Sequence, residues 1–227
     1  MRKIPDKWLG EEIKGSLERT LKDPEPKVNV PIQPIEIPVN FNIPNPDDYI
    51  YVPSTQLFVA KDLSYLRGNW DQCYKLLREE DSFMMNIYQF AEFLKHLKEN
   101  PNPKHNDIYD NITSVRSPER AEWLDATFGE DNIIYHEINS NGNSKLIEER
   151  LKKHLTQSRT PGINLEEWIN NHNSQGLPHP NISHGDLFYW RPRNGRVTRF
   201  SAGEAGSGLY CGRLSLFSIN WLGVRAA

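Results

Sequence analysis

Apolar residues recur at helical spacing in three stretches of the chain, which predicts amphipathic helices over residues 8–22, 69–80 and 87–98. The third stretch has a clear start signal, because Asn86 precedes its apolar run and Gln89 follows three residues later. Its apolar positions, which we expect to face the core, are Ile87, Phe90, Phe93, Leu94 and Leu97.

Three further segments carry weaker helix signals. The serine–proline pair at 117–118 is a suitable N-cap followed by proline at the first helical position, and it predicts a helix that includes Trp123. The charged residues 145–155 predict a helix on the surface. The asparagine and glutamate that bound 164–167 resemble a capping box and predict a short helix around Trp168.

Strand patterns dominate elsewhere. Residues 49–61 are rich in β-branched and aromatic side chains around a proline–serine break, which predicts a strand pair or one kinked strand. The Asn-Gly sequence within 138–144 predicts a tight turn. After about residue 172, short strand-like runs alternate with Gly, Asn and Ser, and no strand–helix–strand alternation is visible. Helices in the first half and strands in the second predict an α+β fold.

Residues 24–46 differ from the rest of the chain. They contain seven of the sixteen prolines, and apolar residues nearly alternate with other residues between them. Proline is incompatible with a helix interior or a central strand, so we predict an extended arm. Its apolar side chains need cover, either on the chain's own body or on a neighbouring subunit. Residues 1–46 are thus predicted as an N-terminal helix and arm, and 47–227 as the compact domain.

The composition narrows the classes of function. The formal charge is −3, which argues against a general nucleic-acid-binding surface. No apolar stretch reaches 18 residues, so we expect no membrane insertion. The first 20 residues lack the apolar core of a signal peptide, so we expect synthesis in the cytoplasm. Cys73 and Cys211 are too few for a disulfide framework, and we expect both to be buried and reduced.

No nucleophile elbow or phosphate-binding loop is present, so we expect no catalytic residues and no cofactor. Acids and histidines do occur in loops, but not at the spacing of a calcium or zinc loop, so we expect no metal. These positions are Asp47, Asp48, Glu130, Asp131, His172, His179, His184 and Asp186.

The final part of the chain resembles a known family. The stretches "SHGDLFYWRPRNGRVTRF", "LYC" and "LGVRAA" resemble the C-terminal variable region of the target proteins of diversity-generating retroelements. Upstream stretches such as "SVRSPERAEWLDATF" extend the resemblance to roughly residues 49–227. It implies a C-type lectin fold of the branch related to formylglycine-generating enzymes, with a variable region at about 185–227. Such proteins occur in phages, archaeal viruses and bacteria, and they bind ligands.

In this family a reverse transcriptase randomises chosen codons, so part of the segment varies while the scaffold stays constant. Side chains alternate across a strand, so one face can be held constant while the other varies. We expect Phe200, Ala202, Leu209 and Cys211 to face inward and 222–225 to form the constant closing strand. The predicted variable, solvent-facing residues are Ser201, Gly203, Gly206, Gly208, Tyr210, Gly212, Arg213, Leu216, Phe217, Ile219 and Trp221.

The resemblance implies a binding protein rather than an enzyme, with a protein or glycan ligand on a cell or virion surface. It also implies that the protein itself acts at a virion or cell surface. The arm over 24–46 is a candidate for self-association. Two alternatives stay open: a non-variable lectin-fold protein with a structural or assembly role, and an oxidase of the formylglycine-generating type. In the first alternative the glycines mark bulges and 217–221 is core.

Overall fold

The computed structural model forms two compact units, Met1–Ile37 and Pro38–Ala227. The residues that the structure describes are 7–8, 11–12, 46–138 and 144–227.

The first unit contains two short strands among its described residues. Strands β1 (Lys7–Trp8) and β2 (Glu11–Glu12) pair antiparallel. The predicted helix over 8–22 is therefore wrong at its start, where the glycine at position 10 weakens the helical pattern. The rest of that helix lies outside the described residues. So does the predicted arm over 24–46, except for its last proline, which opens the 3₁₀ helix η1 (Pro46–Asp48).

Helices α1 (Trp70–Glu79) and α2 (Ile87–Glu99) each begin with a reciprocal capping box. At α2 the Asn86 side chain accepts from the Gln89 N–H at 2.9 Å, and the Gln89 side chain accepts from the Asn86 N–H at 2.9 Å. Two otherwise unpaired backbone donors are satisfied in this way at each helix start. The predicted helices over 69–80 and 87–98 are confirmed, and the five apolar positions of α2 are buried.

Helix α4 (Leu165–Asn171) confirms the predicted short helix, since the Asn164 side chain accepts from the Glu167 N–H at 2.9 Å. Helix α3 (Pro103–Thr113) was not predicted. Its proline-rich start indicates the end of α2, but proline also fits the first turn of a new helix.

Two predicted helices are wrong. The segment after 117–118 forms strand β5 (Arg120–Phe128), because its apolar run is buried on both faces, as in a central strand. Periodicity alone does not separate such a strand from a buried helix. The segment 145–155 instead contains strand β7 (Ser144–Arg150), which pairs with β6 (Asn132–Ile138). The predicted turn between them falls on residues 139–143, which lie outside the described residues.

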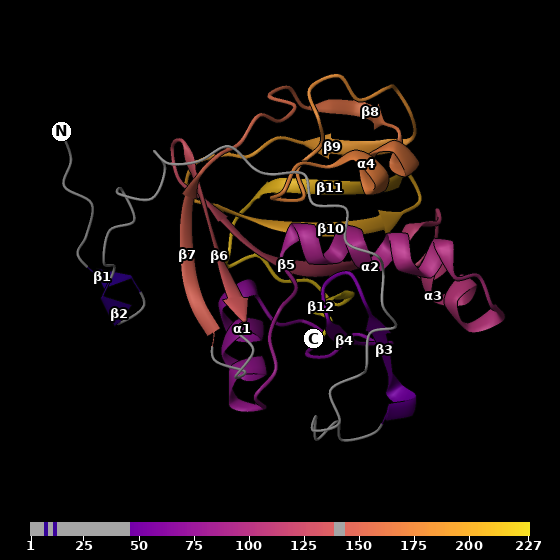
Figure 1. The fold of residues 1–227 in the computed structure, drawn as a ribbon, viewed down its shortest axis with the longest axis horizontal. Coiled ribbons are helices and arrows are strands. Elements are labelled where there is room, and N and C mark those ends of the chain that lie inside the picture. Colours follow the sequence, from indigo (N-terminus) through magenta and orange to yellow (C-terminus); the bar gives the residue numbers. More distant parts are fainter. Residues whose placement is uncertain (1–6, 9–10, 13–45, 139–143) are drawn as a thin grey trace, which may run out of the picture. The chain divides into compact units, whose positions relative to one another are not determined.

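A mixed eight-stranded sheet is the centre of the second unit in its described part (Figure 1). The strand order is β7–β6–β5–β10–β11–β9–β8, and β12 pairs with β5. Neighbours are antiparallel except β11–β9 and β12–β5. The predicted α+β class is confirmed. The remaining strands are β3 (Tyr49–Val52), β4 (Leu57–Ala60), β8 (Arg159–Ile163), β9 (Leu187–Trp190), β10 (Arg196–Gly203), β11 (Gly206–Arg213) and β12 (Leu222–Val224).

The antiparallel strands β3 and β4 confirm the predicted strand pair for 49–61. Two apolar clusters cover the central strands from opposite faces. Helices α2, α3 and α4 pack on one face, which includes Leu124 and Phe200. Helix α1 and strand β12 belong to the cluster on the other face, which includes Trp123 and Val197. Burial on both faces makes β5 and β10 the rigid centre of this unit.

The end of the chain is anchored deep in this unit. The Arg225 side chain is 1% exposed, and its Nε donates to Glu122 Oε2 at 3.1 Å. Its Nη1 donates to the carbonyl oxygens of Ala60 and Lys61. This arginine therefore ties the C-terminal strand to both β5 and the end of β4. Residues 222–224 form the expected closing strand, and all of 222–225 are buried.

Candidate ligand-binding surface

Strands β10 and β11 have one face that packs in the core and an opposite face that carries the predicted variable residues. On the buried face Phe200, Leu209 and Cys211 belong to the cluster under α2 and α4. The other face has Arg199 paired directly with Tyr210 across the two strands. Side chains that are paired in this way point to the same face of a sheet. The expectation that Phe200, Ala202, Leu209 and Cys211 face inward is confirmed by their burial.

Arg199 is the centre of the second face. It is 3% exposed, and its guanidinium carbon lies 5.1 Å from the ring centroid of Tyr210, 5.1 Å from Phe217 and 5.6 Å from Trp221. These distances are within the range of cation–π attraction. Its Nε and Nη1 are buried and have no hydrogen-bond partner among the residues that the structure describes.

A second arginine stacks on two of the same rings. The guanidinium carbon of Arg213 lies 5.0 Å from the Tyr210 centroid and 5.6 Å from that of Phe217. Trp190 extends the group, since its ring stacks on Tyr210 at 6.1 Å between centroids. We call these residues the arginine–aromatic surface. Its members are Trp190, Arg199, Tyr210, Arg213, Phe217 and Trp221.

The electrostatics of this surface are dominated by the two arginines. Burial, and secondly the charge of Arg213, lowers the pKa of Arg199 to about 10, so it remains charged at neutral pH. Glu119 acts on both arginines but forms no ion pair within 4.0 Å with either of them in the described part of the chain. Burial raises the pKa of Glu119, while the two arginines act in the opposite direction.

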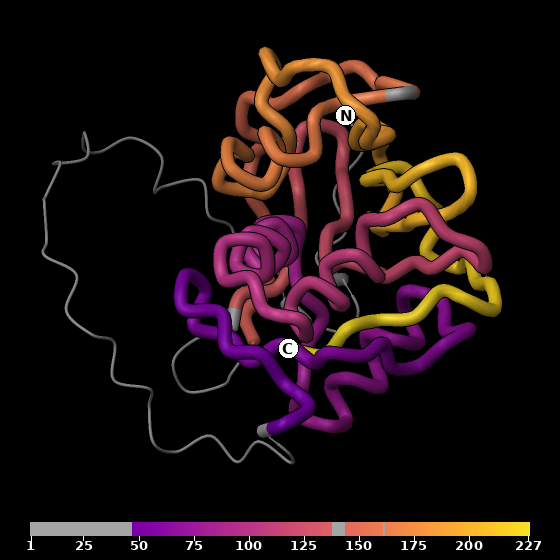
Figure 2. Tube along the Cα trace, turned by 90° about the vertical axis from the view of Figure 1, so that its right-hand side faces the viewer, coloured from indigo at the N-terminus to yellow at the C-terminus, as the bar shows by residue number. Residues whose placement is uncertain are grey.

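The segment between β11 and β12 forms the outer part of this surface. Residues 214–221 alternate between exposed and half-buried positions. Phe217, Ile219 and Trp221 are half-buried against the cluster of α1, whereas Leu216 is 76% exposed. Backbone hydrogen bonds from the Trp70 N–H to Ser215 and from the Ala121 N–H to Trp221 hold the segment in place. Figure 2 shows the final segments of the chain, in yellow, along one side of the second unit.

The predicted variable residues divide into accessible and covered positions. Tyr210, Arg213, Phe217 and Trp221 gather on one face and are half-buried, and Ile219 is half-buried against the cluster of α1. Leu216 is exposed, and Gly206 and Gly212 are partly accessible.

The expectation of solvent exposure is wrong for Ser201, Gly203 and Gly208, which are buried. A Cβ on Gly203 would lie 2.9 Å from Glu119 Cγ. A Cβ on Gly208 would lie 2.7 Å from Cε2 of Tyr210. Neighbouring side chains therefore fill the space above these glycines.

Sequence reasoning missed two members of this surface, Arg199 and Trp190, and three exposed residues beside it, Leu214, Ser218 and Asn220. Arg199 was counted with neither the variable nor the constant residues, although its parity on β10 places it on the outer face. Trp190 and Leu214 are 39% and 59% exposed, and both are large apolar residues that attract attention once exposure is known. Ser218 and Asn220 are exposed as well, because the parity of the segment is the reverse of the one predicted for 217–221.

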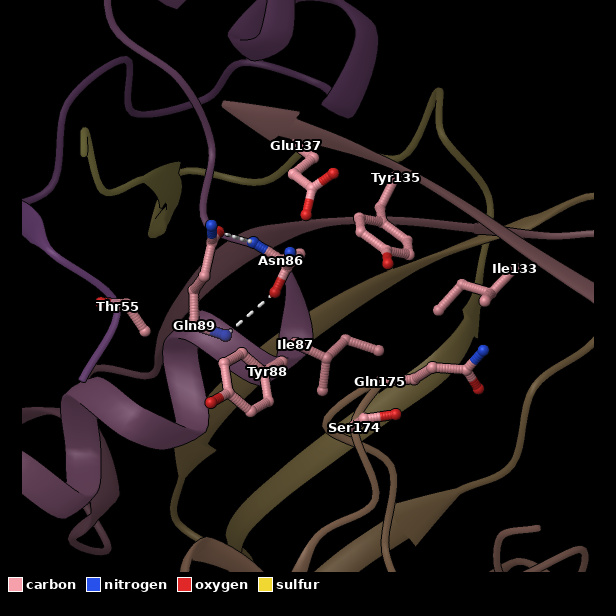
Figure 3. Close-up of a pocket in the computed structure, with 10 residues that line it drawn as sticks. All are labelled: Thr55, Asn86, Ile87, Tyr88, Gln89, Ile133, Tyr135, Glu137, Ser174 and Gln175. Atoms are coloured by element: carbon pink, nitrogen blue, oxygen red, sulfur yellow. Dashed lines mark hydrogen bonds between the residues drawn. The ribbon is translucent and has the colours of Figure 1, made fainter. Parts of the chain in front are cut away.

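A pocket of about 280 Å³ lies at the start of α2, away from this surface (Figure 3). Its polar side chains mostly bond to each other or to nearby backbone. Asn86 and Gln89 form the capping box, and Gln175 bonds to Glu149, Arg150 and the Lys152 N–H. Few free hydrogen-bonding groups remain for a ligand, so this pocket is explained by local structure.

A buried polar chain links α1 to the sheet. Asp125 accepts from the His136 backbone N–H at 2.6 Å and lies 3.0 Å from its Nδ1, and Nε2 of His136 lies 2.7 Å from the Tyr74 hydroxyl. The ring of Tyr74 also stacks on Trp70. Because the imidazole is engaged at both nitrogens, this chain holds α1 in place.

The two cysteines are in different apolar clusters, Cys73 with α1 and Cys211 under α4. Both are buried and free, as expected. Burial raises the pKa of each thiol to about 12, so neither is an activated thiolate. The oxidase alternative needs a closely placed reactive pair, and this arrangement gives it no support.

The acidic and histidine positions weighed as metal ligands are dispersed. Within the described ranges no three carboxylate, imidazole or thiol groups come together as a metal site requires. His172 Nε2 lies 3.3 Å from Glu92 Oε1, and both side chains are largely buried. None of the helices in the described part has the length and apolar character needed to cross a bilayer.

No protein-family model, curated protein or solved structure matches this chain. The proposed function therefore rests on the geometry of the surface.

Proposed function

We propose that this chain is a ligand-binding protein that carries a variable surface on a rigid scaffold of the C-type lectin type. Its variable region would be diversified by a retroelement, and its ligand would be on a cell or virion surface. The observation that carries the proposal is the alternation of more buried and more accessible side chains along residues 209–221. Leu209 and Cys211 are sealed in the core, whereas the intervening and following residues reach the surface.

The physical basis is a separation of folding from recognition. Strand β10 is held on both sides, by β5 and by β11, and its inner face packs under two helices. Strand β12 returns the chain to the core beyond the surface segment and is held by the buried Arg225. The exposed residues between these anchors, at 214, 216, 218 and 220, can change without removing core contacts. Rigid placement favours binding, because ordering a loose surface would reduce the affinity.

The residue types also fit a binding role. Tyrosine, tryptophan and arginine supply large contact areas at a modest entropy cost and are enriched among the residues that dominate binding energy. All three types are present in the arginine–aromatic surface. A tolerance experiment tests the separation. One library randomises Arg213, Leu214, Leu216, Ser218 and Asn220, and a matched library randomises five buried positions.

Display on yeast with a protease challenge measures which members fold. We expect most members of the surface library to survive. The matched library at Phe200, Ala202, Leu209, Cys211 and Leu222 is expected to lose most of its members, because core cavities and buried polar groups are strongly destabilising. Equal survival of the two libraries would contradict the proposed scaffold.

The retroelement is tested in the DNA. We expect a near-identical copy of the sequence that encodes the end of the chain, differing mainly at adenines, beside a reverse transcriptase gene. If the flanking DNA holds neither, diversification is ruled out and the protein is a fixed binding protein.

A further inference from the structure

The segment that forms the surface has a charge opposite to that of the chain. Residues 185–227 contain six arginines, no lysine and only two acids, whereas the whole chain has a formal charge of −3. Arg225 is neutralised by Glu122. None of the ion pairs among the described residues includes any of the other five, which are Arg191, Arg193, Arg196, Arg199 and Arg213.

Two buried arginines of this segment have opposite surroundings. Arg225 donates to a carboxylate and two carbonyl oxygens, which is the pattern of an arginine that supports folding. Arg199 has three aromatic rings around it, and two of its buried nitrogens have no hydrogen-bond partner in the described part of the chain. A buried charge without hydrogen-bond partners opposes folding. The field of such a charge is also screened less by water and salt than that of an exposed one.

The positive charge of Arg199 is reinforced rather than cancelled at the surface. Arg213 stacks on the same two rings, Tyr210 and Phe217, and is itself half-exposed. The carboxylate of Glu119 acts on both arginines from beyond ion-pair distance. The two arginines thus carry more positive charge than the one carboxylate of Glu119 balances. A ligand can reach this charge at Arg213, which is partly exposed.

Apolar side chains next to these charges indicate what kind of molecule carries the complementary group. Leu214 is 59% and Leu216 is 76% exposed, and Trp190 is exposed beside Tyr210. Exposed aliphatic side chains are covered best by other apolar side chains, and sugars pack chiefly on aromatic faces. The two leucines are the most exposed apolar side chains here, whereas the rings of Tyr210, Phe217 and Trp221 are half-buried, so the surface favours a protein segment over a glycan.

We propose that the arginine–aromatic surface binds an acidic segment of a protein ligand, with its carboxylates toward Arg213 and Arg199 and its apolar side chains on Leu214 and Leu216. This assignment rests on the proposed function, because it names the ligand chemistry of the same surface. Arginine suits this task, since its planar guanidinium can pair with a carboxylate while its face stacks on an aromatic ring.

The test is a selection of random 12-residue peptides on phage against the immobilised full chain. We expect the enriched peptides to contain more aspartate and glutamate than the unselected library, together with apolar residues. Fluorescence anisotropy then measures the affinity of an enriched peptide and of its counterpart with glutamine for glutamate. The glutamine counterpart, and separately Arg213→Gln, is expected to weaken binding by about tenfold or more.

Matched variants separate a binding role from a folding role. Arg150→Gln, an exposed arginine on the edge strand β7, is expected to leave peptide binding unchanged. Arg199→Met is expected to abolish the preference for acidic peptides while the Tm stays the same or rises. A large fall in Tm for Arg199→Met would show that this arginine supports folding, and the proposal would be wrong.

Three other outcomes would overturn the proposed acidic protein ligand. Enriched peptides that are apolar but not acidic, and that lose binding on Leu216→Ser, would overturn the acidic ligand and leave the proposed binding function standing. If no peptide is enriched over an unrelated control protein, the acidic protein ligand is also overturned. Binding to an array of acidic glycans with no acidic peptide enriched would replace the protein ligand by a carbohydrate. Failure of the proposed scaffold itself would be seen separately, in the tolerance libraries.

Discussion

Replacing Arg225 with methionine removes the anchor that connects β12 to the rest of its unit. The variant loses the 3.1 Å bond from Nε to Glu122 and the bonds to the carbonyl oxygens of Ala60 and Lys61. It also leaves a carboxylate that is 1% exposed without its nearest cation. Removing one partner of a buried ion pair costs about 3–5 kcal/mol. Arg120, at 3.3 Å from the other carboxylate oxygen, favours the lower end of that range.

For a unit of this size each kcal/mol corresponds to about 2–4 °C in Tm, so the expected fall is about 6–20 °C. Urea unfolding followed by circular dichroism gives the free energy, and a thermal scan gives Tm. The double variant with Glu122→Leu removes both charges and should be more stable than Arg225→Met alone, because no unpaired buried carboxylate remains. A loss below about 1 kcal/mol for Arg225→Met, or a double variant no more stable than the single one, would refute this reasoning.

Three further predictions follow from local geometry. Cys73 and Cys211 should not react with Ellman's reagent at pH 8 in the folded protein, because burial raises the pKa of both thiols to about 12. Both should react after unfolding in guanidinium. Reaction of either thiol in the folded protein would contradict the structure. Gly208→Ala should destabilise the protein by about 1–3 kcal/mol, because the new Cβ would lie 2.7 Å from the Tyr210 ring, and Tyr210→Ala should relieve most of that loss in a double-mutant cycle by thermal unfolding. Asn86→Ala should lower the free energy of unfolding by about 1 kcal/mol through loss of the α2 cap, and an unchanged urea midpoint would argue against the capping box.

Local signals in the sequence were sufficient for several elements. The caps at Asn86 and Asn164 define their helices because a side-chain acceptor three residues from a backbone donor needs no distant partner. The alternation in β10 and β11 identified the buried face, since side-chain parity in a strand is independent of the fold. Short strands with turns between them likewise indicated the α+β class.

Long-range contacts decided what the sequence left ambiguous. Whether the apolar run of β5 becomes a helix or a strand depends on its pairing with β10 and β12, which come about seventy or more residues later. The same holds for the candidate surface. Arg199 is distinctive only because Phe217 and Trp221 return to it from another part of the chain. By itself the sequence determined the caps and the strand parity, because these interactions are local. The surroundings of each charged side chain were decided by the tertiary structure, because they depend on residues that only folding brings together.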